Sequence, residues 1–251
     1  MSPPATSPGA RPHRMSPPAQ VSAFILGDPY LREVYASVYR TLAGLIPDVG
    51  GAVVEIGAGS ALGRTWIPGL ICTDIVPAGE LDAVVDAQQL PFAPGSLRAI
   101  VVKDGLHHLP DVAAFLDEAV RCLTPGGAVL MCEPYWGPLA RLVYTRLHPE
   151  PYDPARPEWH FTSGSAWDSN QALPWILLRR DRARLHARWP HLRVREIATA
   201  VGPSYLLSGG VFSRTPLSGR LLRIVHRWEQ GRGRSLDRWR LSIIVSLERI
   251  R

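Results

Sequence analysis

The stretch from Val53 to Gly63 constrains the fold of this chain more than any other part of the sequence. It reads Val-Val-Glu-Ile-Gly-Ala-Gly-Ser-Ala-Leu-Gly, an apolar run followed directly by closely spaced glycines. Such a run is typical of a buried strand, and the glycines permit a tight turn before a helix. A second apolar run ends at Asp74, nineteen positions after Glu55. Because an acid at that separation can bind ribose hydroxyls, the pattern predicts a nucleoside cofactor site in an α/β fold.

The spacing of the glycines distinguishes between two classes of cofactor. A dinucleotide site has its third glycine three residues after the second, but here Leu62 holds that position and Gly63 follows it. Glu55 stands just before Gly57, where a carboxylate can pair with a cationic amino group. A cofactor that contains adenosine and an amino acid but no phosphate fits this arrangement. We therefore favour S-adenosylmethionine over a nicotinamide cofactor.

Five segments between residues 50 and 135 resemble, in order, the motifs of class I S-adenosylmethionine-dependent methyltransferases of the type 11 kind. These segments are Glu55–Gly59, Asp74, Asp86–Phe92, Leu106–Leu109 and Leu123–Gly127. The resemblance implies specific roles in cofactor binding. The expected cofactor-binding residues are Glu55, Gly57, Ala58 and Gly59 in the first turn, Asp74 and Ile75 at the ribose, Asp86 and Ala87 at the adenine, and Lys103 and His108 after the fourth strand.

One departure from the family pattern lies between Asp74 and Asp86. Only eleven residues separate the two acids, which is too few for the helix that usually intervenes. We therefore expect the adenine to be more exposed than usual, or to be covered by another segment.

The alternation of apolar runs with amphipathic stretches predicts a Rossmann-like seven-stranded, mostly parallel α/β sheet with helices on both faces. The last two strands should form the antiparallel pair that ends the sheet in this family. The predicted strands lie near 52–56, 70–74, 82–85, 99–103, 128–133, 192–199 and 241–247, and the predicted helices cover 28–45, 111–123, 138–147, 169–187 and 217–229.

The chain divides into a tail and one domain. Residues 1–20 contain six prolines, which predicts a disordered tail, and residues 21–251 should form the class I methyltransferase domain. Residues 134–190 are not needed for the core fold, and they hold five of the eight tryptophans. We interpret them as a cap insertion after strand five on the substrate side. Their aromatic side chains can form a substrate pocket or a small satellite core.

The predicted first helix carries Tyr30 and Tyr35. In the family that the chain resembles, this helix lies over the cofactor, so both tyrosines could close over the methionine part. Packing of both rings into the core is the alternative.

Four residues are catalytic candidates: His107, Glu133, Tyr135 and His148. Methyl transfer from a sulfonium mainly needs alignment of the acceptor and exclusion of water, and a base helps when the acceptor is a hydroxyl. His107 could instead serve only to shape the turn after the fourth strand. Glu133 could instead cap the next helix. A metal needs three or four converging ligands. His148 and Glu150 offer no such set, so we expect no metal site.

Charge is spread unevenly along the chain. Residues 1–140 carry 8 basic and 13 acidic residues, a net charge of −5, and residues 141–251 carry 20 basic and 9 acidic residues, a net charge of +11. A basic half can indicate a nucleic-acid partner. We expect no nucleic-acid partner, because arginines on solvated helix faces explain the excess of positive charge. The sequence has no secretory signal and no apolar run long enough to span a membrane, so we expect a cytoplasmic protein. Its oligomeric state is left open.

The sequence therefore predicts methyl transfer from S-adenosylmethionine to a small organic molecule such as a secondary metabolite or lipid. Two alternatives stay open, a methyltransferase for RNA or protein and a non-catalytic module that binds the cofactor. A nicotinamide-dependent oxidoreductase is disfavoured by Leu62 and by the turn at 123–127.

Overall fold

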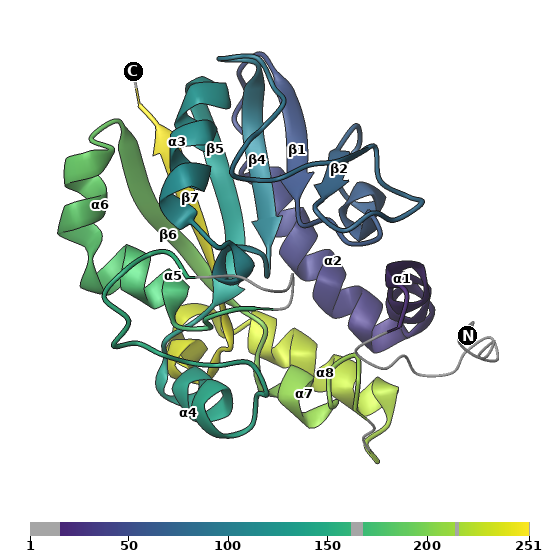
Figure 1. Ribbon diagram of the computed structural model, residues 1–251. Helices are drawn as coiled ribbons and strands as arrows, with labels where there is room; N and C mark the ends of the chain where they lie inside the picture. The colour runs from purple at the N-terminus through teal and green to yellow at the C-terminus, as the bar shows by residue number, and fades with distance from the viewer. Residues whose placement is uncertain (1–15, 162–167, 214–215, 251) are drawn as a thin grey trace, which may run out of the picture.

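The computed structural model describes residues 16–161, 168–213 and 216–250, and in them a single seven-stranded sheet carries helices on both faces (Figure 1). The strand order is β3-β2-β1-β4-β5-β7-β6. The strands are β1 (Ala52–Ile56), β2 (Ile71–Asp74), β3 (Ala83–Val84), β4 (Leu97–Lys103), β5 (Leu123–Pro134), β6 (Leu192–Ala200) and β7 (Ser242–Arg249). Strands β1 to β5 pair in parallel, and β7 runs antiparallel to both β5 and β6. The predicted fold class is confirmed.

Four of the five predicted helices are present. The α-helices are α1 (Pro18–Gly27), α2 (Pro29–Gly44), α3 (Val112–Cys122), α4 (Pro138–Arg146), α5 (Leu173–Trp175), α6 (Arg182–Arg188), α7 (Pro203–Leu207) and α8 (Gly219–Gln230). The four predicted ones are α2, α3, α4 and α8, whereas the sequence pattern predicts no helix at α1 or α7. Shorter turns are η1 (Leu62–Thr65), η2 (Leu106–His108), the π-helical η3 (Ile176–Arg180) and η4 (Gly233–Trp239). The carboxylates of Asp28 and Asp111 accept hydrogen bonds from the first turns of α2 and α3, as expected of N-caps.

The continuous helix predicted over 169–187 is wrong. The chain enters α5 only at Leu173, passes through η3 and starts α6 at Arg182. Asn170 Oδ1 accepts hydrogen bonds from the backbone N–H groups of Asp153 and Ala172, at 2.9 and 3.0 Å. These bonds hold the backbone before α5 in a turn, which a pattern of apolar residues does not reveal.

The two faces of the sheet build two hydrophobic clusters. Val54 and Ile56 of β1 contact the cluster that includes Phe115 of α3. Val53, on the opposite face, belongs to the cluster that includes Leu42 of α2. Successive strand residues point to opposite faces, so helices on both sides are needed to bury them.

The boundary of the expected N-terminal tail is only partly testable. Residues 1–15 lie outside the described residues. Within 16–20 the expectation of disorder is wrong, because α1 begins at Pro18. Proline suits the first position of a helix, and Ile25 of α1 is buried in the cluster around α2. The proline-rich composition concealed this helix start.

Two tryptophans of the 134–190 segment, Trp159 and Trp189, belong to the core. The indoles of Trp159 and Trp189 stack with centroids 5.9 Å apart, and both are buried in the cluster around α3. Their Nε1–H groups donate to Asp181 and Asp117, each at 2.8 Å. The core alternative therefore holds for these two rings, whereas Trp167 lies outside the described residues. No helix in the described ranges is long and apolar enough to cross a membrane.

Candidate active site

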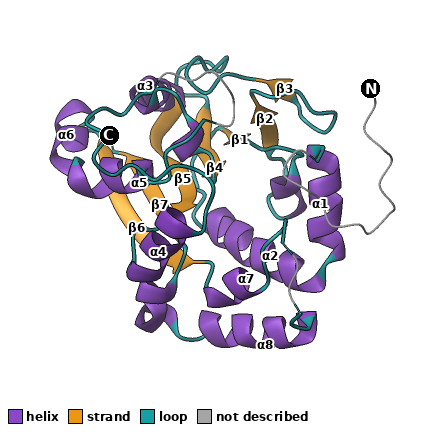
Figure 2. Cartoon of the chain, turned by 60° about the horizontal axis from the view of Figure 1, so that its bottom comes forward, coloured by secondary structure: helices purple, strands orange, loops and turns teal. Residues whose placement is uncertain are grey.

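The predicted site residues gather at the carboxyl edge of the parallel strands. Figure 2 looks onto this edge, with α1, α2, α7, α4 and α5 arranged around it. The turn after β1 contains Gly57 at φ 70° and Gly59 at φ 57°. Both angles lie in the left-handed region that glycine adopts without a steric penalty. The sequence requires glycine at these positions because the turn has this shape.

Asp74 holds the glycine turn. Its carboxylate accepts hydrogen bonds from Gly59 N–H at 2.8 Å and from Val76 N–H at 2.9 Å. Ala58 N–H donates to the carbonyl of Thr73 at 2.9 Å, so the turn is also tied to β2. The first two expected cofactor-binding segments therefore meet at one point.

Apolar side chains at the ends of β2 and β3 are uncovered. Ile75, Val76 and Val84 are 55%, 42% and 58% exposed. Asp86 lies after β3, and its Oδ1 accepts hydrogen bonds from Gln88 N–H at 2.8 Å and Gln88 Nε2 at 3.1 Å. Ala87 beside it is buried. The residues between β2 and β3 form turns without a helix, which leaves this apolar surface open.

Glu55 does not face the open side of the turn. Its carboxylate is buried, Tyr39 Oη donates to Oε1 at 2.7 Å, and Oε2 packs against Gly63. Burial raises the pKa of Glu55 to about 7, even though the Tyr39 hydrogen bond favours the charged form. The expected direct pairing with a ligand amino group is therefore not what the structure shows, because α2 covers the carboxylate.

Lys103 and Asp104 form an ion pair at the end of β4. Lys103 Nζ also lies 4.6 Å from the ring centroid of Tyr35, in a cation–π contact. Asp104 has φ 52°, a left-handed conformation that is uncommon outside glycine. Burial would lower the pKa of Lys103, but the adjacent Asp104 carboxylate holds it well above its usual value.

Tyr30 and Tyr35 have separate environments. Tyr35 contacts Lys103 at the sheet edge. Tyr30 is buried, and its hydroxyl donates to Ser204 Oγ at 3.1 Å. For Tyr30 the core alternative is correct, because α7 and α8 cover that end of α2.

Glu133 is buried beneath the turn that carries the histidines. Its Oε1 accepts from Gly105 N–H and Leu106 N–H, both at 2.8 Å, and its Oε2 lies 2.7 Å from His107 Nδ1. With no exposed surface, Glu133 cannot contact a substrate as a catalytic residue would. Burial alone would lower the pKa of His107, but the Glu133 carboxylate raises it to about 10.

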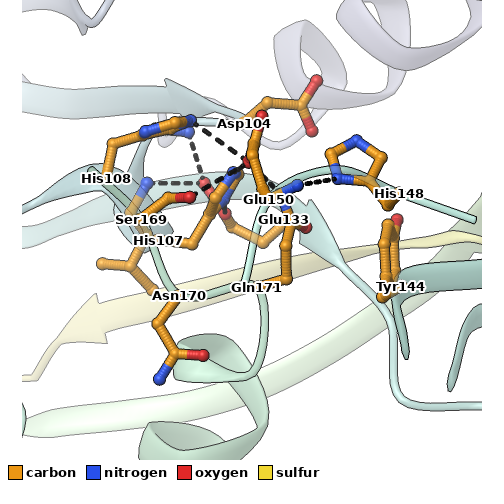
Figure 3. A network of polar contacts seen from close by, with 12 residues as sticks. Asp104, His107, His108, Glu133, Tyr144, His148, Glu150, Ser169, Asn170 and Gln171 are labelled. Carbon is orange, nitrogen blue, oxygen red and sulfur yellow. Dashed lines mark hydrogen bonds and ion pairs between the residues drawn. The ribbon is translucent and has the colours of Figure 1, made fainter. Parts of the chain in front are cut away.

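His107 and His108 share a third neighbour that the sequence did not pair with them. Glu150 Oε2 lies 3.6 Å from His107 Nε2 and 3.7 Å from His108 Nε2 (Figure 3). His108 Nδ1 lies 3.2 Å from the carbonyl oxygen of Asp168. The histidine pair was identified from its motif, whereas its pairing with Glu150 had no signal in the sequence.

Tyr135 and His148 lie in other surroundings. Tyr135 lines an open hollow of about 690 Å³ whose other lining residues come from α4 and η4, among them Asp237 and Trp239. The His148 ring lies edge-on to Tyr144 with centroids 5.6 Å apart, and its Nδ1 faces Glu150 N–H at 3.4 Å. The four expected catalytic residues therefore do not converge, since Tyr135 faces η4 and His148 faces Tyr144.

Comparison with known proteins agrees with this geometry. Residues 54–131, from β1 to β5, match the Methyltransferase domain family. The fold is that of a solved S-adenosylmethionine-dependent methyltransferase from Archaeoglobus fulgidus, at a TM-score of 0.52 and 12% identity over 86% of this chain and 94% of that one. Residues 54–131 therefore carry a methyltransferase domain of the class I S-adenosylmethionine-dependent kind. The cofactor of this family is S-adenosylmethionine.

Two relatives and one further structure illustrate the range of similar methyltransferases. A demethylmenaquinone methyltransferase of Streptomyces avermitilis is 40% identical over 63 residues, 24% of this chain and 27% of the relative. A ubiquinone/menaquinone biosynthesis C-methyltransferase of Rhizobium leguminosarum is 32% identical over 108 residues, 43% of this chain and 37% of the relative. The geranyl diphosphate C-methyltransferase of Streptomyces coelicolor has a TM-score of 0.51 and 14% identity, over 93% of this chain and 83% of that one. The matched segments thus span well under half of each curated relative.

Proposed function

We propose that this methyltransferase transfers a methyl group from S-adenosylmethionine to a small organic acceptor. The observation that carries the proposal is the hydrogen bond between Gly59 N–H and Asp74 Oδ2, at 2.8 Å. It joins the glycine turn to the acid of the neighbouring strand, which leaves backbone amides and a carboxylate at one sheet edge. That combination suits an adenosine ribose beside a close backbone approach.

Each part of the cofactor has a candidate partner at this edge. Asp74 takes the ribose hydroxyls, and the exposed Ile75 covers the adenine ring. The adenine amino group donates a hydrogen bond to the Asp86 carboxylate. The turn from Gly57 to Gly59 adjoins the methionine part. Lys103 supplies a cation for the methionine carboxylate, next to the turn that carries His108. The exposed apolar surface around Ile75 supports this assignment, because an adenine would bury it.

The acceptor side is assigned to the turn that carries His107. S-adenosylmethionine supplies an activated methyl group whose leaving sulfur is neutral. The protein's task is to orient the acceptor and, for a hydroxyl or acidic C–H acceptor, to take its proton. Among the four expected residues, His107 is assigned to this side because Glu133 fixes its ring. Since its pKa is about 10, the ring is protonated near neutral pH and can orient an acceptor by donating a hydrogen bond rather than take its proton. Tyr135 and His148 are assigned to the walls of the 134–190 cap.

A small acceptor is favoured over a macromolecule by the names of the similar proteins. The relatives are named for demethylmenaquinone and ubiquinone/menaquinone, and one structural neighbour for geranyl diphosphate. All of these are small organic molecules with apolar parts. We therefore propose an acceptor of this kind, without choosing between oxygen, nitrogen and carbon as the methylated atom.

Calorimetry tests the cofactor assignment. The wild type should bind S-adenosylmethionine, and Asp74→Ala should weaken binding about 10-fold or more, the loss of a charged hydrogen-bond partner. Glu80→Gln, an exposed acid in the same loop, is the matched control. Tight NADH binding without S-adenosylmethionine binding would refute the proposal.

A transfer assay with labelled S-adenosylmethionine tests the acceptor class. Quinone precursors, prenyl diphosphates, total RNA and a protein extract serve as acceptors. Label in the small molecules is the expected result. Label confined to RNA or protein would overturn the small-molecule assignment, and transfer to none despite tight cofactor binding would favour a non-catalytic module.

A further inference from the structure

We propose that His107, His108 and Glu150 form a binding site for a divalent transition-metal ion such as Zn²⁺. The two histidines lie on η2 after β4, and Glu150 lies in the segment after α4. Figure 3 shows the three side chains pointing toward one another. This inference revises the expectation of no metal site, and it goes beyond the proposed function because metal binding is measurable without methyl transfer.

The spacing of the three ligand atoms suits a metal ion. Glu150 Oε2 lies 3.6 Å from His107 Nε2 and 3.7 Å from His108 Nε2, and all three atoms lie within 4.8 Å of one another. Zinc binds nitrogen and oxygen at about 2.1 Å, so a tetrahedral ion separates its ligands by about 3.4 Å. Shifts of a few tenths of an ångström at the shorter separations, and more between the two rings, would complete such a site.

Hydrogen bonds on the far side of each ring set the protonation of its nitrogens. His107 Nδ1 lies 2.7 Å from Glu133 Oε2, and His108 Nδ1 lies 3.2 Å from the carbonyl of Asp168. Both oxygens only accept, so each Nδ1 must carry the donated proton. An ion that binds between the rings and Glu150 displaces any proton on each Nε2 and uses the Nε2 lone pair. At 3.6 Å a proton on Nε2 makes no good hydrogen bond, whereas an ion between the three acceptors satisfies all of them.

The surroundings of the ligands match those of metal sites. Metal-binding histidines and carboxylates usually have a hydrogen-bond partner behind them, which fixes their orientation. Here Glu150 accepts from Gln171 Nε2 and from Ser169 Oγ, the latter at 3.3 Å. The side chains of His107, His108 and Glu150 are only 3%, 25% and 27% exposed. This is a supported and shielded group rather than a chance encounter of surface side chains.

The donor set indicates which ion the site would take. Two imidazoles and one carboxylate suit Zn²⁺ or Co²⁺, whereas Mg²⁺ and Ca²⁺ prefer oxygen ligands. Three protein ligands leave a position open for water or for an oxygen atom of an acceptor. That last step, an acceptor oxygen on the ion, rests on the proposed function.

The test is a titration of the chelator-treated full chain with Co²⁺ and with Zn²⁺. We expect one ion per chain, visible absorption bands with Co²⁺ and displacement of Co²⁺ by Zn²⁺. His108→Ala and Glu150→Gln should each lower the affinity roughly 100-fold or more. His186→Ala, which removes an exposed histidine of α6, is the matched control and should leave the affinity unchanged. His107→Ala is avoided because it would leave the buried Glu133 without its partner.

Two results would overturn the site. One is wild-type binding no tighter than that of His108→Ala, and the other is an equal loss in the His186→Ala control. Circular dichroism and thermal unfolding check that the variants fold. If the wild type binds one Co²⁺ but no S-adenosylmethionine, the metal site stands and the proposed function fails.

Discussion

Glu133 and His107 meet at 2.7 Å beneath the turn between β4 and α3, and the carboxylate also accepts two backbone N–H groups of that turn. One buried acid on β5 thus determines the orientation of an imidazole on η2. Because the Glu133 carboxylate has no exposed surface, its role is to position His107 rather than to contact an acceptor.

Replacing Glu133 should therefore destabilise the fold. Glu133→Gln keeps an acceptor for the two backbone N–H groups but puts an amide N–H₂ against His107 Nδ1 and removes the charge that balances the imidazolium. The expected loss of unfolding free energy is about 3 kcal/mol. Urea denaturation measures the loss. Glu158→Gln, which alters an exposed acid, should change stability by less than about 0.5 kcal/mol. Equal effects of the two substitutions would contradict the positioning role of Glu133.

The pH dependence of stability should reveal Glu55. Its pKa is about 7 in the folded protein, above the ordinary 4.5, so the folded state binds more protons than the unfolded state between these values. Stability therefore falls as the pH rises from about 4.5 to 7, by up to about 3 kcal/mol. Glu55→Gln, which keeps an acceptor for Tyr39, should remove that slope. Denaturation of both proteins from pH 5 to 8 checks it, and parallel curves would be inconsistent with a raised pKa.

Gly63 should not tolerate a side chain. A Cβ atom there would overlap Glu55 Oε2 and lie 2.8 Å from Tyr39 Cε1 and 2.9 Å from Leu70 Cδ2. We expect Gly63→Ala to lower the unfolding free energy by about 1–3 kcal/mol. Gly79→Ala has nothing within 4 Å and is the control. Thermal unfolding of the two variants compares them, and an unchanged midpoint for Gly63→Ala would contradict the close packing.

Trp159 should contribute to stability rather than to cofactor binding. Its indole is buried against Trp189 and donates to Asp181. Trp159→Ala should cost about 3–5 kcal/mol, as for other large core residues, while the affinity for S-adenosylmethionine stays unchanged. Trp239→Ala, at a half-exposed indole, should cost much less. Guanidinium denaturation and calorimetry provide the two readouts, and a weakened cofactor affinity would place Trp159 at the site instead.

The sequence by itself determined the sheet, its seven strands and the family. Apolar runs and glycine turns indicate local backbone preferences, and the folded chain adopts the preferred conformation at β1, β2 and β4. The pairing of Gly59 with Asp74 could also be anticipated, because both follow adjacent parallel strands. The turn at Asn170 could not, since a side chain that bonds to the backbone leaves no periodic signal.

Only the tertiary structure decided the partners of the charged residues. Glu55 faces Tyr39 instead of a ligand, and Glu133 supports His107 instead of contacting an acceptor. Glu150 lies beside the two histidines of the turn after β4 as well as next to His148 in the chain. The physical reason is that a buried charge requires a compensating partner. That partner comes from whichever segment the fold packs nearby, and spacing along the chain does not encode which segment that is.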